Sequence, residues 1–245
     1  MRKPLVAAVA AVTAVGGATV AFAQNPAPSP TLDVTVTPTK AGTKRKPAPI
    51  KLFLSVQNNV ESKTTMSKLE IDLPKYVKAS GKGLPSCKFS TLSANGPAGC
   101  PRGSKAGSGQ AHAQLNPSSA QPTPLTFQVT AFNGGATTLL FYLSQEGGSI
   151  KAALQGKLAF KGGKYNQKLT IAIPQNLQQP VPNVYSALVD FSDTLYLKKG
   201  RRSLLTTFGC KNKKHDFAAK LSYAPNPTPP AAPTATATAS APCTK

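Results

Sequence analysis

Apolar and polar residues alternate along most of the chain between residues 32 and 223. The segment 32–36 shows the pattern simply, because Leu32, Val34 and Val36 flank Asp33 and Thr35. Such alternation buries one face of an extended strand and leaves the other in solvent. The same pattern predicts strands over further segments: 50–56, 69–73, 108–115, 125–131, 137–144, 150–160, 169–173, 184–191, 194–197, 203–208 and 216–223.

Gly-Gly pairs at 134–135, 147–148 and 162–163 separate strands in the middle of the chain. Glycine adopts the positive φ angles that tight hairpin turns require, so these pairs predict an antiparallel meander of four strands. No amphipathic helix of ordinary length is expected. The pattern predicts an all-β fold, an antiparallel β-sandwich of about ten or eleven strands, with a β-barrel as the alternative.

The N-terminus has the features of an export signal. Arg2 and Lys3 precede an apolar stretch, and Ala-Phe-Ala at 21–23 matches a cleavage site. We therefore expect a signal peptide over 1–23 and a Pro-rich linker over 24–31. A membrane anchor is the alternative, but the stretch is near the lower length limit for spanning. The mature protein is expected to be secreted or cell-wall-associated, with no transmembrane segment after signal cleavage.

The C-terminal segment 224–245 has low complexity, because Ala, Pro and Thr make up 18 of its 22 residues. Such a composition buries little apolar surface against the entropy of ordering the chain. We expect a disordered tail here, which leaves 32–223 as the folded β-sandwich region.

The chain is strongly basic, with 29 Lys and Arg residues against 8 Asp and Glu, a formal charge of +21. Signal cleavage would remove Arg2 and Lys3 and leave +19. Most of the cations are lysines, which are hydrated point charges, whereas arginine provides bidentate recognition. This composition predicts diffuse attraction to anions. The candidate anion-binding residues form three clusters in predicted loops: Lys44, Arg45 and Lys46; Lys198, Lys199, Arg201 and Arg202; Lys211, Lys213 and Lys214.

Anionic cell-envelope polymers are the expected partners of these clusters. Specific nucleic-acid binding is not expected, because neither an aromatic stacking platform nor a groove-reading helix is visible in the sequence. The oligomeric state is open.

The four cysteines predict disulfides, since an even cysteine count in an exported protein favours them. A Cys87–Cys100 bond is preferred, because the segment between these residues is short and rich in Gly and Pro. The pairing of Cys210 and Cys243 is left open, because the tail residue Cys243 can bond to Cys210, cross-link two chains or react with a wall component.

The sequence offers few groups for catalysis or metal binding. His112 and His215 are the only histidines, and neither stands in a nucleophile motif or in a set with metal-ligand spacing. We expect no catalytic residue, no metal site and no cofactor. A hydrolase acting on glycans or esters is the alternative, and a cleft that joins His215 to Asp190 or Asp193 would favour it.

Two segments resemble a group of exported β-rich proteins from high-GC Gram-positive bacteria. In SCKFSTLSANGPAGCPRGSKAGSGQA, a Cys, a second Cys followed by Pro, a Ser and a Gly-x-Gly precede a strand. The run LLTTFGCKNKKHDFAAKLSYAPNP resembles a second element, with Cys210 and His215 in matching places. That family is uncharacterised. The resemblance implies an exported sandwich-like domain with a Cys87–Cys100 disulfide, and it implies no activity.

The sequence thus favours a non-enzymatic extracellular or wall-associated protein that binds anionic envelope polymers through basic loops. Besides the hydrolase, a structural surface protein without a specific ligand is a further alternative.

Overall fold

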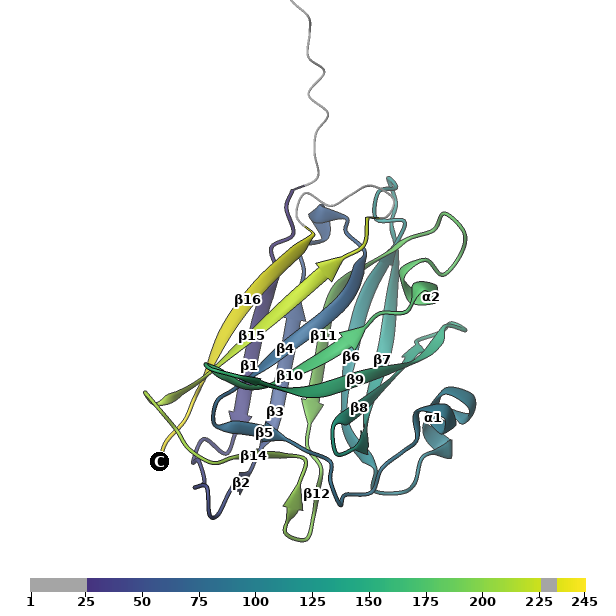
Figure 1. Cartoon of the computed structure of the whole chain (residues 1–245). Helices are drawn as coiled ribbons and strands as arrows, with labels where there is room; N and C mark the ends of the chain where they lie inside the picture. The colour runs from purple at the N-terminus through teal and green to yellow at the C-terminus, as the bar shows by residue number, and fades with distance from the viewer. Residues whose placement is uncertain (1–25, 226–232) are drawn as a thin grey trace, which may run out of the picture.

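The fold is described from a computed structural model, which covers residues 26–225 and 233–245. The predicted signal peptide, 1–23, lies outside these residues. Eleven antiparallel strands form one large sheet (Figure 1). In spatial order they are β1 (Thr31–Thr37), β3 (Lys51–Gln57), β11 (Ser186–Leu195), β6 (Lys105–Leu115), β7 (Thr123–Gly135), β8 (Thr138–Gln145), β9 (Lys151–Gly162), β10 (Tyr165–Ala172), β4 (Met66–Pro74), β15 (Lys214–Tyr223) and β16 (Thr234–Pro242).

The sheet curls until its two edge strands, β1 and β16, lie side by side (Figure 1). Just beyond their ends, Lys40 and Thr244 form a parallel bridge. There the Ala41 N–H donates to the Thr244 carbonyl at 2.8 Å, and the Thr244 N–H donates to the Thr39 carbonyl at 2.9 Å. The all-β prediction is confirmed, and the continuous sheet is nearly barrel-shaped.

The predicted four-strand meander corresponds to β7, β8, β9 and β10, which pair in sequence order. The turn between β9 and β10 shows why it needs glycine, because Gly162 and Gly163 have φ angles of +81° and +65°. These angles lie in the left-handed region that other residues rarely adopt. The Gly-Gly prediction is confirmed for this part of the chain.

Alternate side chains of the strands meet inside the curled sheet and form one continuous core. Phe217 on β15, Ile71 on β4 and Val56 on β3 are among its fully buried members. Their polar neighbours on the same strands face outward. The period-two pattern therefore identified the buried face of most strands, whereas Phe160 near the end of β9 shares the apolar phase of Leu158 and is 80% exposed.

The C-terminal segment differs from the prediction of a disordered tail. Residues 234–242 form β16, which pairs with β15 over its whole length. Ala237 and Ala241 are buried against the core, while the β-branched threonines between the alanines favour extended backbone. The rest of the predicted tail includes 226–232, which lie outside the described residues.

Both cysteine pairs form disulfides. Cys87 and Cys100 have Cα atoms 5.1 Å apart, which confirms the preferred pairing. Cys210 and Cys243 have Cα atoms 5.9 Å apart, so the structure selects intramolecular bonding among the alternatives left open for these two residues. The second disulfide connects the end of β16 to the loop before β15.

The segment between Cys87 and Cys100 contains the helix α1 (Phe89–Asn95) and the 3-10 helix η2 (Pro97–Gly99). Leu92 of α1 is buried with Phe132 and Leu140 in a small cluster separate from the main core. Elsewhere the described chain forms two more short helices, η1 (Val60–Ser62) and α2 (Gln175–Gln178). The strands predicted at 184–191 and 194–197 are one strand, β11.

Asn133 holds the Cys87 segment against the sheet from a fully buried position. Its Nδ2 donates to the carbonyls of Gly81, Leu84 and Pro85 at 3.2, 3.4 and 2.8 Å. Its Oδ1 accepts from the Gly135 N–H at 3.0 Å. One amide side chain thus ties the carbonyls of the loop that precedes α1 to the end of β7.

Two small sheets lie at the lower end of the large one in Figure 1. The first joins β2 (Ala48–Pro49), β14 (Leu205–Thr207) and β5 (Val77–Ala79), and the second is the hairpin of β12 (Lys198–Lys199) and β13 (Arg202–Ser203). The basic clusters lie around these sheets, although not all in loops as predicted: Lys198, Lys199 and Arg202 belong to β12 and β13, and Lys214 begins β15. Across the described ranges, the helices are too short or too polar to cross a membrane.

Candidate functional site

The three predicted basic clusters lie at the same end of the curled sheet, which we call the basic end. Figure 1 shows the loop before β2 and the β12–β13 hairpin at its lower edge, and the loop before β15 at its lower left, above the C-terminus. The Gly42 N–H donates to the Thr207 Oγ1 at 3.3 Å, and the Cys243 N–H donates to the Lys213 carbonyl at 2.9 Å. These bonds connect the first loop to β14 and the third loop to the C-terminus.

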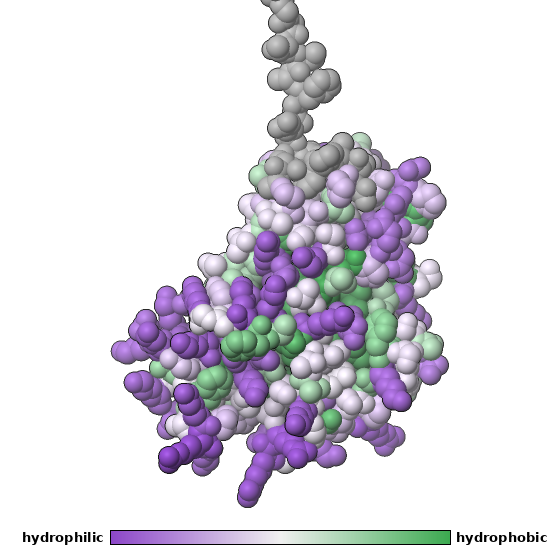
Figure 2. All heavy atoms as spheres, viewed as in Figure 1, coloured by the Kyte–Doolittle hydropathy of each residue, from purple (hydrophilic) through white to green (hydrophobic). Residues whose placement is uncertain are grey.

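The cations of these clusters point into solvent and have few counter-ions. All ten of the predicted anion-binding residues are exposed, and Figure 2 shows hydrophilic side chains projecting from the lower part of the molecule. Among the ten, Lys214 alone has a carboxylate partner within the described chain, Asp216 at 3.4 Å. Arg202 instead donates to the Gly83 carbonyl at 2.9 Å. The basic end is therefore a surface of mostly uncompensated positive charge.

Within the basic end, a concave region of about 240 Å³ lies between three turns, and we call it the lysine pocket. Lys75 follows β4, Lys164 lies in the β9–β10 turn, and Lys211 and Lys214 flank the start of β15. Asp216 is the single carboxylate among the residues that line it. Lys75 and Lys164 were not among the predicted anion-binding residues, because each stands alone in its turn.

The loop that carries Lys211 and Lys214 is held in a defined conformation. Asn212 and Lys213 have φ angles of +55° and +57°, and the Lys214 N–H donates back to the Lys211 carbonyl at 3.3 Å. The adjacent Cys210 is bonded to the end of β16 through its disulfide. Two of the pocket lysines are thus placed by a tight turn and a covalent bond.

Asp216 lies between two of these lysines, 3.4 Å from the Lys214 Nζ and 4.0 Å from the Lys164 Nζ. Its pKa is below the ordinary value, mainly because the Ser240 hydroxyl donates a hydrogen bond to it and also because these cations are near. The charged carboxylate offsets one of the four lysine charges.

His215 also lines the lysine pocket and is 1% exposed. Neither ring nitrogen has a hydrogen-bond partner in the described structure. Burial lowers the pKa of the imidazole, so it is neutral at pH 7. The positive charge of the pocket therefore comes from lysine alone.

The structure does not assemble the site that the hydrolase alternative requires. No hydrogen bond in the described chain joins His215 to Asp190 or Asp193. Asp190 instead bonds to His112, with 2.8 Å between Oδ1 and Nδ1, at positions that line neither the lysine pocket nor the apolar cavity described below.

Asp193 is a buried carboxyl in the core, 2% exposed, and neither oxygen has a hydrogen-bond partner within residues 26–225 and 233–245. Burial raises its pKa to about 7, and the nearby Thr194 amide and Lys105 offset only part of this effect. A Cβ atom at residue 107 would lie 2.8 Å from the Asp193 Oδ1. Glycine at that position therefore leaves room for the carboxyl.

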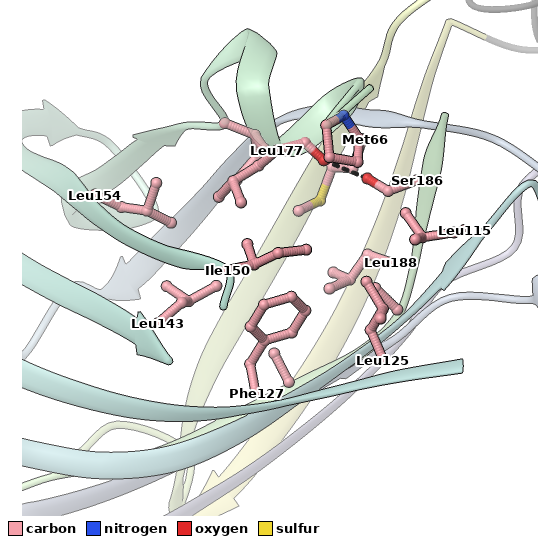
Figure 3. Close-up of a pocket in the computed structure, with 14 residues that line it drawn as sticks. Met66, Leu115, Leu125, Phe127, Leu143, Ile150, Leu154, Leu177, Ser186 and Leu188 are labelled. Carbon is pink, nitrogen blue, oxygen red and sulfur yellow. Dashed lines mark hydrogen bonds between the residues drawn. The ribbon is translucent and has the colours of Figure 1, made fainter. Parts of the chain in front are cut away.

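A second concave feature, the apolar cavity, has a volume of about 80 Å³ and lies inside the sheet below α2. Figure 3 shows Leu143, Ile150, Leu188 and Phe127 pointing toward one another around it. Ser186 is the single polar side chain in the lining, and its hydroxyl donates to the Leu177 carbonyl. Among the described lining residues no polar group is free, so the cavity can accept an apolar group but has no hydrogen-bonding side chain to orient a polar ligand.

The described residues contain no group of three His, Cys, Asp or Glu side chains arranged to hold a metal ion. Comparison with known proteins finds no matching family model, no matching curated protein and no matching solved structure. The resemblance to exported β-rich proteins therefore stays a prediction, and the inference of function depends on the chemistry of the basic end.

Proposed function

We propose that this protein is a non-enzymatic, extracytoplasmic binding module whose basic end associates with anionic polymers of the cell envelope. The observation that carries the proposal is the convergence of three loop clusters, far apart in sequence, at one end of the sheet. Ten exposed cations in loops and short strands, most without a carboxylate partner among the described residues, leave a positive field available for a ligand.

Two further observations support this proposal. Both disulfides fit an oxidising compartment outside the cytoplasm. Seven of the ten cluster cations are lysines, whose hydrated charges attract polyanions with little demand for geometry. The attraction is therefore diffuse, and it weakens with salt, because the screening length falls from about 8 Å at 0.15 M ionic strength to about 3 Å at 1 M.

Binding to purified wall polymer at increasing salt concentrations tests the proposal. The wild-type protein is expected to bind at low salt and to dissociate well below 1 M. Replacing the β12–β13 cations with Gln (Lys198, Lys199, Arg201 and Arg202) removes four charges from the basic end. This variant should bind more weakly. The slope of the logarithm of its binding constant against the logarithm of salt concentration should be shallower by roughly one unit for each cation lost from contact.

The matched control replaces four exposed lysines outside the three clusters, Lys88, Lys151, Lys157 and Lys220, so its net charge equals that of the first variant. If the basic end binds the polymer, this control retains most of the wild-type affinity. Equal weakening in both variants would show that net charge alone drives binding. Binding that is absent at low salt, or unchanged in molar salt, would overturn the proposal and favour a structural surface protein without a specific ligand.

A further inference from the structure

We propose that the lysine pocket binds a phosphate monoester group, carried on the anionic polymer as an end group or substituent. This inference rests on the proposed function and names the chemical group that one part of the basic end selects. The remaining loops attract polyanions of many kinds, whereas this pocket is concave and has a fixed arrangement of charge.

The charge of the pocket favours the most highly charged small group that fits. Lys75, Lys164, Lys211 and Lys214 line a space of about 240 Å³, and Asp216 is the single carboxylate there. The net charge is therefore three positive units around one ligand site. A phosphate monoester carries about two negative charges at pH 7, whereas a phosphate diester or a carboxylate carries about one.

Two features distinguish the pocket from a chance gathering of surface lysines. The Cys210–Cys243 disulfide and the left-handed turn at Asn212 and Lys213 fix the segment that holds two of the lysines. The Asp216 carboxylate, which accepts a hydrogen bond from the Ser240 hydroxyl, lies 3.4 Å from the Lys214 Nζ and 4.0 Å from the Lys164 Nζ and so holds two of the pocket lysines in place.

The second charge of the monoester sets the expected selectivity. We take three net positive charges about 5 Å from the ligand in water, with a screening length of about 8 Å at physiological salt. Their attraction raises the affinity about tenfold for each negative charge on the ligand. A monoester is therefore expected to bind about tenfold more tightly than a diester of similar size.

Calorimetric titration of the full mature protein with glycerol 3-phosphate and with dimethyl phosphate tests this inference. The pocket variant combines Lys75→Gln and Lys164→Gln, because neither residue belongs to the three loop clusters. Its matched control combines Lys151→Gln and Lys157→Gln on the exposed face of β9. All four side chains are exposed, so both variants should keep the thermal stability of the wild type.

The expected result is saturable glycerol 3-phosphate binding, about tenfold tighter than dimethyl phosphate binding, that falls at least tenfold in the pocket variant and little in the control. Equal affinity for the two phosphates, or equal affinities in the two variants, would overturn the inference.

Polymer binding is measured on the same samples, so that the two proposals can fail separately. If the wild type binds glycerol 3-phosphate and not wall polymer, the proposed function fails and the phosphate site stands. If it binds wall polymer without preferring the monoester, the phosphate site fails and the proposed function stands.

Discussion

The unpaired carboxyl of Asp193 should make the protein less stable as the pH rises. In the folded chain its pKa is raised from 3.8 to about 7 by burial. The folded state therefore binds this proton more tightly than the unfolded state does between these two pH values. Stability falls with rising pH wherever the folded state holds more protons, so this group weakens the fold progressively from about pH 4 to about pH 7.

The size of the effect follows from the shift. One pKa unit corresponds to about 1.4 kcal/mol, so a shift of about three units removes about 4 kcal/mol of stability by pH 8. Asp193→Asn keeps the shape of the protonated side chain and cannot ionise. We expect the variant to match the wild type near pH 4 and to exceed it by about 4 kcal/mol at pH 8.

Urea denaturation at pH 4 and pH 8, followed by circular dichroism, measures this difference. The difference between wild type and variant isolates the contribution of Asp193, because every other group titrates in both proteins. The buried His215, with its lowered pKa, affects the stability of wild type and variant alike. Ser192→Ala, which changes a neighbouring non-titrating side chain, is the control and should keep the wild-type slope. The reasoning is refuted if the unfolding free energy of the wild type rises relative to that of the variant between pH 4 and pH 8, or if the difference between the two proteins does not change.

The remaining predictions concern the disulfides and Asn133. Replacing Cys210 and Cys243 with Ser opens a loop of 33 positions and should cost about 3.7 kcal/mol of unfolding free energy in urea, against about 2.9 kcal/mol for the 13-position Cys87–Cys100 loop. A larger loss at Cys87–Cys100 would contradict the loop-entropy argument. Asn133→Ala should lower stability by about 2–4 kcal/mol, because the carbonyls of Leu84 and Pro85 lose their donor, whereas that of Gly81 keeps the Leu84 N–H; a loss below about 1 kcal/mol would show that water replaces the amide.

The strands of the core could be predicted because their own residues encode a buried face. β16 could not, since its alanines are small and its threonines polar, and the pattern resembles a low-complexity tail. What orders it is remote in sequence: the β15 backbone and the bond from Cys243 to Cys210. Local composition carries no information about that pairing. The helix α1 was missed for a related reason, since the buried Leu92 packs on distant residues of the sheet.

The basic clusters could be found by their runs of adjacent cations, whereas the lysine pocket could not. Lys75 and Lys164 are single lysines in turns, and only the sheet order, which pairs β10 with β4 and β4 with β15, brings them beside Lys211. Asp193 did leave a signal. It shares the inward phase of Phe191 and Leu195, and treating this segment as one strand would have predicted a buried carboxyl.

The position of the two chain ends determines how the protein can be attached to a surface or a label. In Figure 1 the described chain enters near the start of β1, at the end of the sheet opposite the basic loops. Lys245 lies at the basic end, since Thr244 bridges to Lys40 there. A linker on the N-terminal side therefore presents the cations outward, away from the support. A polyhistidine label or dye at Lys245 would stand among those cations and alter the binding under study.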